Sequence, residues 1–101
     1  MIQITCKGNS AVCTLTDRLT SGMVGVTCEF VFDEAWEGLS KTAVFSAGRE
    51  QRDVLLTGNA CTVPWEVLAH SGYLLSVGVY GTNTDGTLVI PTVYVPCGRI
   101  D

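Results

Sequence analysis

Hydrophobic and polar residues alternate along most of this chain, which is the pattern of half-buried β-strands. In the segment 24–32, apolar residues occupy every second position from Val24 to Phe32. A period of two places these side chains on one face of a strand, and that face is expected to be buried. The segment 73–80 is almost continuously apolar. This predicts a central strand with both faces covered.

Short glycine-containing segments separate the alternating runs at four places: Gly8-Asn9, Gly48-Arg49, Gly58-Asn59 and Asn83–Gly86. Glycine supplies the positive φ that tight turns require, so we interpret each segment as a hairpin turn. About eight short strands result, at the spacing typical of a sandwich or barrel. The sequence therefore predicts an all-β fold, an antiparallel β-sandwich of the immunoglobulin-like kind.

Helix is expected only as one short turn near Pro64–Ala69. Pro64 suits a first helical position, and Gly72 follows the end of the turn. The segment 33–39 begins with a candidate cap, Asp33, but we interpret it as a compact loop between strands. No repeat, linker or low-complexity segment divides the chain, so residues 1–101 are predicted to form a single β-sandwich domain.

The composition describes a chain that can bury a core, with 47% hydrophobic and 16% charged residues. The net charge is −4 and the six basic residues are scattered, whereas nucleic-acid binding requires clustered positive charge. No apolar run approaches the roughly 18 residues of a membrane span. The first seven residues alternate instead of forming a signal peptide. We therefore expect a soluble protein that is synthesised in the cytoplasm and binds neither nucleic acid nor membrane.

The chain contains five cysteines: Cys6, Cys13, Cys28, Cys61 and Cys97. An odd number cannot pair completely within one chain, and no secretory segment indicates an oxidising compartment. Cysteines in strand-like runs behave as small hydrophobic residues. We expect reduced, mostly buried thiols.

Residues suited to catalysis or metal binding are few and isolated. His70 is the only histidine and no two cysteines have C-x₂-C spacing, so the usual zinc patterns are missing. Ser46 and Ser76 lack the glycines of a nucleophile elbow, and we interpret His70 as a solvated loop residue. Asn83–Gly86 lacks the bidentate carboxylate of a calcium loop. The sequence predicts no enzymatic activity, no cofactor and no metal.

Acidic residues gather in one stretch: Glu29, Asp33, Glu34 and Glu37. A carboxylate pair can serve glycoside hydrolysis, but we favour a solvated acidic loop because so small a domain offers little cleft. Trp36 and Trp65, if exposed, could stack on sugars or anchor a partner. We favour burial for both, as plugs at the ends of the sandwich.

A series of short motifs occurs in order between residues 26 and 95. They are Phe32-Asp33-Glu34-Ala35-Trp36-Glu37-Gly38-Leu39, Lys41-Thr42-Ala43-Val44-Phe45, Val63-Pro64-Trp65-Glu66-Val67-Leu68, Gly72-Tyr73, Val77-Gly78-Val79-Tyr80-Gly81 and Leu88-Val89-Ile90-Pro91-Thr92. In order and spacing, this set resembles the N-terminal domain of the phage baseplate upper protein type. That domain occurs in tail and baseplate proteins of phages and prophages of Gram-positive bacteria.

The resemblance implies a non-enzymatic virion structural protein: the attachment domain of a phage tail, baseplate or fibre protein, which docks a distal module onto the tail. It implies other tail or baseplate proteins as partners, location in the virion, and oligomerisation through the full-length protein. It carries over no catalytic, cofactor-binding or metal residue, and it leaves the binding residues open. Within it, Trp36 and Phe45 are expected in the core, and Ile90-Pro91-Thr92 at an edge or bulge.

Two alternatives stay open at this point. The chain ends at Asp101, soon after the last expected strand, so it is either an attachment domain cut from a longer protein or a short natural member of the family. The alternative function is a carbohydrate-binding or adhesin-like β-sandwich module.

Overall fold

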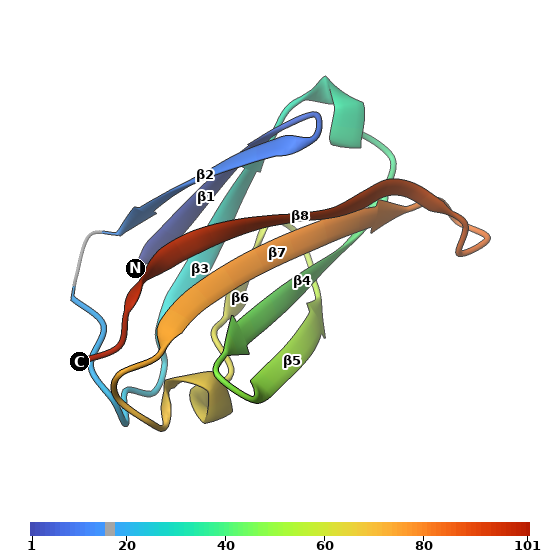
Figure 1. The fold of residues 1–101 in the computed structure, drawn as a ribbon. Helices are drawn as coiled ribbons and strands as arrows, with labels where there is room; N and C mark the ends of the chain where they lie inside the picture. Colours follow the sequence, from blue (N-terminus) through green and yellow to red (C-terminus); the bar gives the residue numbers. More distant parts are fainter. Residues whose placement is uncertain (16–17) are drawn as a thin grey trace.

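The computed structural model describes residues 1–15 and 18–101, which form two four-stranded sheets packed together (Figure 1). The first sheet has the order β2-β1-β3-β6 and contains β1 (Ile2–Lys7), β2 (Ser10–Leu15), β3 (Thr27–Phe32) and β6 (Ala60–Thr62). The second has the order β5-β4-β7-β8 and contains β4 (Ser40–Ala47), β5 (Glu50–Leu55), β7 (Leu74–Thr82) and β8 (Leu88–Arg99). The predicted all-β sandwich is confirmed.

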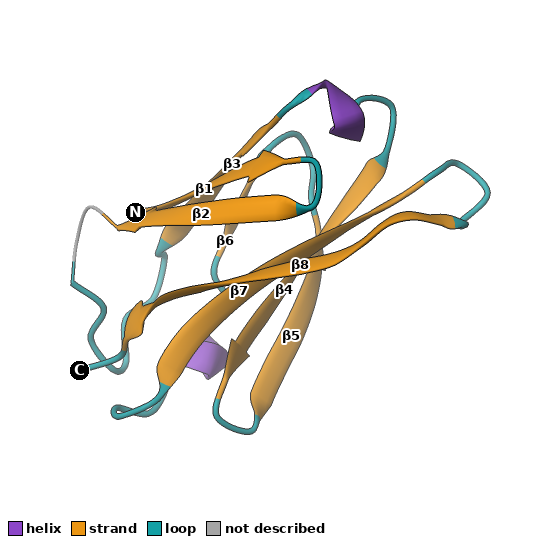
Figure 2. Cartoon of the chain, turned by 45° about the horizontal axis from the view of Figure 1, so that its top comes forward, coloured by secondary structure: helices purple, strands orange, loops and turns teal. Residues whose placement is uncertain are grey.

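Two short 3₁₀ turns complete the fold, η1 (Glu34–Trp36) and η2 (Trp65–Leu68). Figure 2 shows them at opposite ends of the sandwich. The helical turn predicted near Pro64–Ala69 is therefore confirmed as η2, with Pro64 at its N-cap. The strand pairings are antiparallel except for β1 with β3, which are parallel.

Three of the four predicted hairpin turns are confirmed: Gly8-Asn9 joins β1 to β2, Gly48-Arg49 joins β4 to β5, and Asn83–Gly86 lies between β7 and β8. The fourth prediction is wrong in part. Gly58-Asn59 does form a tight turn, closed by a bridge between Thr57 and Ala60. Among the residues that the structure describes, however, β5 pairs only with β4 and β6 pairs only with β3. This turn therefore carries the chain from the second sheet to the first.

The segment 33–39 contains η1, so its interpretation as a plain loop is corrected. The Asp33 Oδ1 atom accepts from the Ala35 N–H at 3.2 Å and caps the turn, while Oδ2 accepts from the Gly8 N–H at 3.1 Å. The Trp36 indole N–H donates to the Gly8 carbonyl at 3.2 Å. Short polar side chains satisfy the free N–H groups at the start of a helical turn. Here the same carboxylate also ties η1 to the β1–β2 hairpin.

The core lies between the two sheets and is built from the inward faces of their strands. It contains Ile2, Ile4 and Cys6 of β1, Cys28 and Phe30 of β3, Phe45 of β4, and Leu75, Val77 and Val79 of β7. Trp36 is completely buried and its ring centroid lies 5.0 Å from that of Phe32. The expected core positions of Trp36 and Phe45 are therefore confirmed.

Strand β7 is central, between β4 and β8, as its apolar sequence predicts. The prediction that both of its faces are covered is wrong for the outer face. Leu74 is 53% exposed there. Only Gly78 is well covered, by the ring of Tyr94, whose Cδ1 would lie 2.7 Å from a Cβ at Gly78. No third layer packs on this face within the described residues, so coverage depends on the neighbouring strand.

Strand β8 is an edge strand with an irregular register. Between the pairs Val79–Val93 and Gly81–Ile90, β8 contributes one residue more than β7. Pro91 falls inside this bulge. Because proline cannot donate a ladder hydrogen bond, it is tolerated at such positions. The edge-or-bulge interpretation of Ile90-Pro91-Thr92 is confirmed.

All five cysteines carry free thiols. Cys6 and Cys28 are buried, while Cys13, Cys61 and Cys97 are half-buried. Burial, with a smaller contribution from the charge of Asp33, raises the pKa of Cys6 to about 11. Burial alone raises the pKa of Cys61 to about 11. Both thiols are therefore neutral in the folded protein at pH values where an exposed thiol ionises.

These pKa shifts predict that stability falls in mildly alkaline solution. Cysteines of the unfolded chain lose their protons near pH 9.0, whereas Cys6 and Cys61 in the folded chain keep theirs to about pH 11. The folded state thus binds more protons in this window, and the free energy of unfolding decreases as pH rises through it. Denaturant unfolding across this range measures the slope. Cys61→Ala should flatten it, and an unchanged slope in that variant would contradict the assignment.

Candidate functional site

At one end of the sandwich, η2, the β4–β5 hairpin and the loop before β7 enclose a pocket of about 210 Å³. Its walls are formed by Ala47, Arg49, Glu50, Glu66, Val67, His70 and Tyr73. Ligand pockets for drug-sized molecules usually hold roughly 300–1,000 Å³. This one is sized for a small ligand or for a single inserted side chain.

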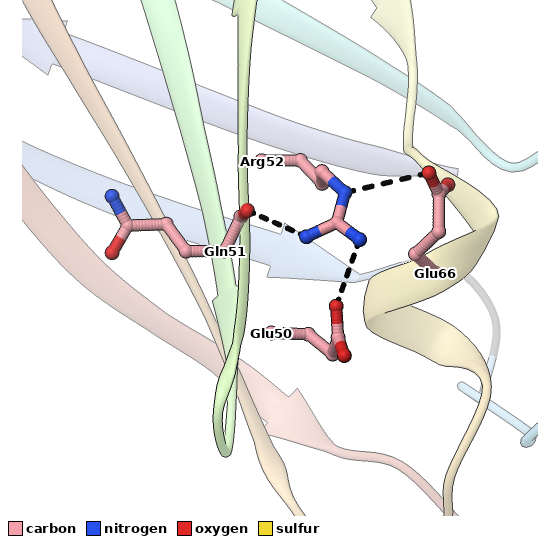
Figure 3. A network of polar contacts seen from close by, with 4 residues as sticks. All are labelled: Glu50, Gln51, Arg52 and Glu66. Atoms are coloured by element: carbon pink, nitrogen blue, oxygen red, sulfur yellow. Dashed lines mark hydrogen bonds and ion pairs between the residues drawn. The ribbon is translucent and has the colours of Figure 1, made fainter.

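One wall of the pocket is organised by Arg52, which lies between two carboxylates (Figure 3). Its Nη2 atom lies 2.9 Å from Glu50 Oε2, and its Nε donates to Glu66 Oε2 at 3.4 Å. Its Nη1 donates to the Gln51 carbonyl at 2.8 Å. Glu50 and Arg52 are two residues apart on a strand and so share a face. The guanidinium therefore holds strand β5 and turn η2 together and orients both carboxylates.

Tyr73 supplies an aromatic wall whose position depends on Gly48. Gly48 has φ +61° in the hairpin turn, and a Cβ there would lie 2.7 Å from Tyr73 Cδ1 and Cε1. Only glycine combines this backbone conformation with such a close approach. The ring thus rests against the hairpin while part of it remains exposed. The pocket has a fixed aromatic surface facing charged groups.

Trp65, the first residue of η2, is 61% exposed, so the predicted burial of this side chain is wrong. The core beneath the turn is already filled by Val63, Val67 and Leu68, all buried. The indole is left on the surface, and the two residues that follow Trp65, Glu66 and Val67, line the pocket. Burial is correct only for Trp36.

The other candidates identified in the sequence keep their structural interpretations. His70 is exposed at the pocket wall, as expected of a solvated loop residue. The four acidic side chains between residues 29 and 37 are exposed, and Asp33 serves as a cap. Asn83 and Asp85 both accept from the Thr87 N–H, at 3.1 and 2.9 Å. These two bonds are those of a hairpin turn.

Ser46 and Ser76 are direct partners across β4 and β7, a proximity that the sequence did not reveal. The pocket itself was also missed. Its members come from three separate segments, and only the spacing of Glu50 and Arg52 on one strand face was visible in the sequence.

A second hollow of about 340 Å³ lies beside β4 and the turn at Gly58-Asn59. Its walls are formed by Leu39, Ser40, Lys41, Leu55, Leu56, Gly58 and Asn59. Lys41 is its only charged residue, and it has no aromatic wall. The first pocket, where several polar groups and an aromatic ring converge, is therefore the better candidate.

Within residues 1–15 and 18–101, no three histidine, cysteine or acidic side chains are grouped so that they could hold a metal ion. None of the helices in this part of the chain is long and apolar enough to cross a membrane. Comparison with family models, curated proteins and solved structures gives no significant match for this chain.

Proposed function

We propose that this chain is a non-enzymatic virion structural protein, the attachment domain of a phage tail, baseplate or fibre protein that docks a distal module onto the tail. The phage assignment rests on the resemblance of residues 26–95 to the domain of the baseplate upper protein type. The observation that carries the docking role is the 61% exposure of Trp65, which directly precedes the pocket residues Glu66 and Val67. Exposed tryptophan is costly in water and is the residue type most enriched among energetic anchors of interfaces.

The docking surface consists of Trp65, Glu66, Arg52 and Tyr73, which we call the η2 surface. It combines two aromatic side chains with two charged ones, Arg52 and Glu66, which hold each other in place through their ion pair. Aromatic side chains lose little conformational entropy on binding, and fixed charges give orientation. The partners are other tail or baseplate proteins, and the location is the virion.

The docking role predicts that Trp65→Ala separates binding from stability. Removing an exposed indole should change the free energy of unfolding by less than about 1 kcal/mol. It should weaken docking on tail particles by about 2 kcal/mol or more, about thirtyfold. The matched control is Tyr94→Ala, an aromatic residue that is 55% exposed on the outer face of the second sheet. Equal binding of wild type and Trp65→Ala to particles would remove the η2 surface from the proposal.

The virion assignment is tested on particles. Antibodies against this domain, and mass spectrometry of purified particles from a host that carries the gene, should locate the protein on the tail. Complete lack of the protein in intact particles would refute the virion role.

A carbohydrate-binding or adhesin-like module is the second candidate. One observation favours it: Tyr73 lines the pocket together with Arg49, Glu66 and His70, and Trp65, which directly precedes Glu66 in the chain, is exposed. Aromatic faces beside charged hydrogen-bonding groups suit a sugar ring. A glycan array screened with the domain separates the two candidates. Strong sugar binding that Trp65→Ala abolishes, together with absence from particles, would favour this second function.

A further inference from the structure

The two sheets meet along one side, where the edge strands β2 and β8 lie next to each other (Figure 1). The approach is close enough that a Cβ at Gly98 would lie 2.8 Å from Leu15 Cδ1. No ladder of backbone hydrogen bonds joins β2 to β8 in the described part of the chain. Along the described part of this seam, the two sheets are therefore held together by contacts between side chains.

Two cysteines face each other across the seam. Cys13 lies on β2 and Cys97 on β8; both side chains pack against the core between the sheets, and each thiol perturbs the pKa of the other. The Cys97 Sγ also approaches the Val95 carbonyl at 3.8 Å. Both side chains are half-buried, so a small reagent can reach them while their positions stay fixed by packing.

We propose that Cys13 and Cys97 are a preformed disulfide site, which closes into a covalent link between the two sheets when the chain meets a small-molecule disulfide. In the first step, the thiolate of one cysteine attacks a sulfur of the reagent and releases one thiolate. The second cysteine, as its thiolate, then attacks the protein sulfur of this mixed disulfide and releases the other thiolate. The two protein thiols are oxidised, the reagent is reduced to two thiols, and the cysteine protons end on those thiols.

The other neighbouring pair, Cys28 and Cys61, is a poorer site. These residues oppose each other on β3 and β6. Backbone hydrogen bonds run from the Val63 N–H to the Val26 carbonyl and from the Phe30 N–H to the Asn59 carbonyl. These two pairs lie two positions to either side of the Cys28–Cys61 pair, and hydrogen-bonded pairs recur at every second position of an antiparallel ladder. Cys28 and Cys61 therefore occupy a hydrogen-bonded position, where opposed residues stand farther apart. Cys28 is in addition fully buried, which denies a reagent access.

The environment also determines how fast the link forms. Burial raises the pKa of Cys13 and that of Cys97, so few thiolates are present at neutral pH. Exchange is expected to be slow near pH 7 and to accelerate as the pH rises, because the thiolate is the attacking species. Such a site stays reduced during synthesis in a reducing compartment and closes on long exposure to an oxidising one. This inference is independent of the phage assignment.

The test uses the whole chain, incubated either with oxidised glutathione or with a reductant. The reduced protein should titrate five thiols and the oxidised protein three, with a mass lower by two hydrogens. A peptide map should link the peptides that contain Cys13 and Cys97. Because the link joins positions near both ends of the chain, it restricts the unfolded state strongly and should raise Tm by about 10 °C or more.

Single variants make the assignment specific. Cys13→Ser and Cys97→Ser should each abolish both the bridge and the gain in Tm, whereas Cys61→Ser should retain them. Five free thiols after prolonged oxidation, a bridge that joins other cysteines, or a stable mixed disulfide with glutathione on Cys97 would each overturn the proposal. Since the wild-type measurements need no substitution, a variant that fails to fold leaves the test intact.

Discussion

Trp36→Ala is expected to lower the free energy of unfolding by about 3–5 kcal/mol, the usual cost of emptying a large aromatic core site. Trp36 is completely buried at the end of the sandwich, against Phe32. Its indole N–H also bonds to the Gly8 carbonyl, so the substitution removes a contact between η1 and the β1–β2 hairpin. Equilibrium unfolding in denaturant, monitored by circular dichroism, measures the loss.

Two comparisons divide this cost into its parts. Trp36→Phe keeps most of the apolar volume and loses the hydrogen bond, which is worth about 1 kcal/mol. Trp65→Ala removes the same type of side chain from an exposed position and should cost less than about 1 kcal/mol. If the two tryptophan-to-alanine variants were equally stable, the assignment of one buried and one exposed indole would be wrong.

Gly81→Ala is expected to cost about 1–3 kcal/mol, although it adds only one methyl group. Near the end of β7, a Cβ at Gly81 would lie 2.9 Å from Leu39 Cδ1 and 3.2 Å from Trp36 Cζ3. The backbone of Gly81 is not in the left-handed region, so the cost arises from overpacking. Thermal or denaturant unfolding gives the magnitude.

Gly78→Ala is the matched control on the same strand. Its Cβ would meet the ring of Tyr94 at 2.7 Å, a shorter distance than any at Gly81. Tyr94 is 55% exposed and can move into solvent, whereas the buried ring of Trp36 has no space to move into. Gly78→Ala should therefore be the milder variant. The reverse order would show that the end of the core beside Trp36 can relax.

The features that local chemistry determines could be predicted from the sequence. Gly8-Asn9 and Gly48-Arg49 impose tight turns by their own backbone preferences, and the alternation identifies the buried face of β3. The predicted buried face was wrong at Val24, which lies before the strand and is 75% exposed. Pairing between distant segments has no such local signal. The two Gly-Asn turns look alike in sequence, yet one closes a hairpin and the other passes between sheets, because partners elsewhere decide the pairing.

The candidate site was less accessible to prediction for the same reason. The burial of Trp65 depends on whether Val63, Val67 and Leu68 leave space beneath η2, which is a property of packing in three dimensions. In the sequence, Arg52 has the pattern of an ordinary solvent-facing residue of an edge strand. Its ion pair with Glu66 is evident only in the three-dimensional structure. The proximity of Cys13 and Cys97 likewise follows only from the meeting of β2 and β8.

The division of each sheet among separate stretches of chain has a consequence for the order of folding. Strand β6 pairs with β3, but the β4–β5 hairpin of the other sheet lies between them in sequence. The hairpins β1–β2, β4–β5 and β7–β8 close short loops and can form early, whereas β1–β3 and β3–β6 require the ends of longer segments to meet. Topologies dominated by such distant pairings fold in roughly milliseconds to seconds. Because segments of the other sheet interrupt each sheet in sequence, neither sheet is expected to fold when excised alone.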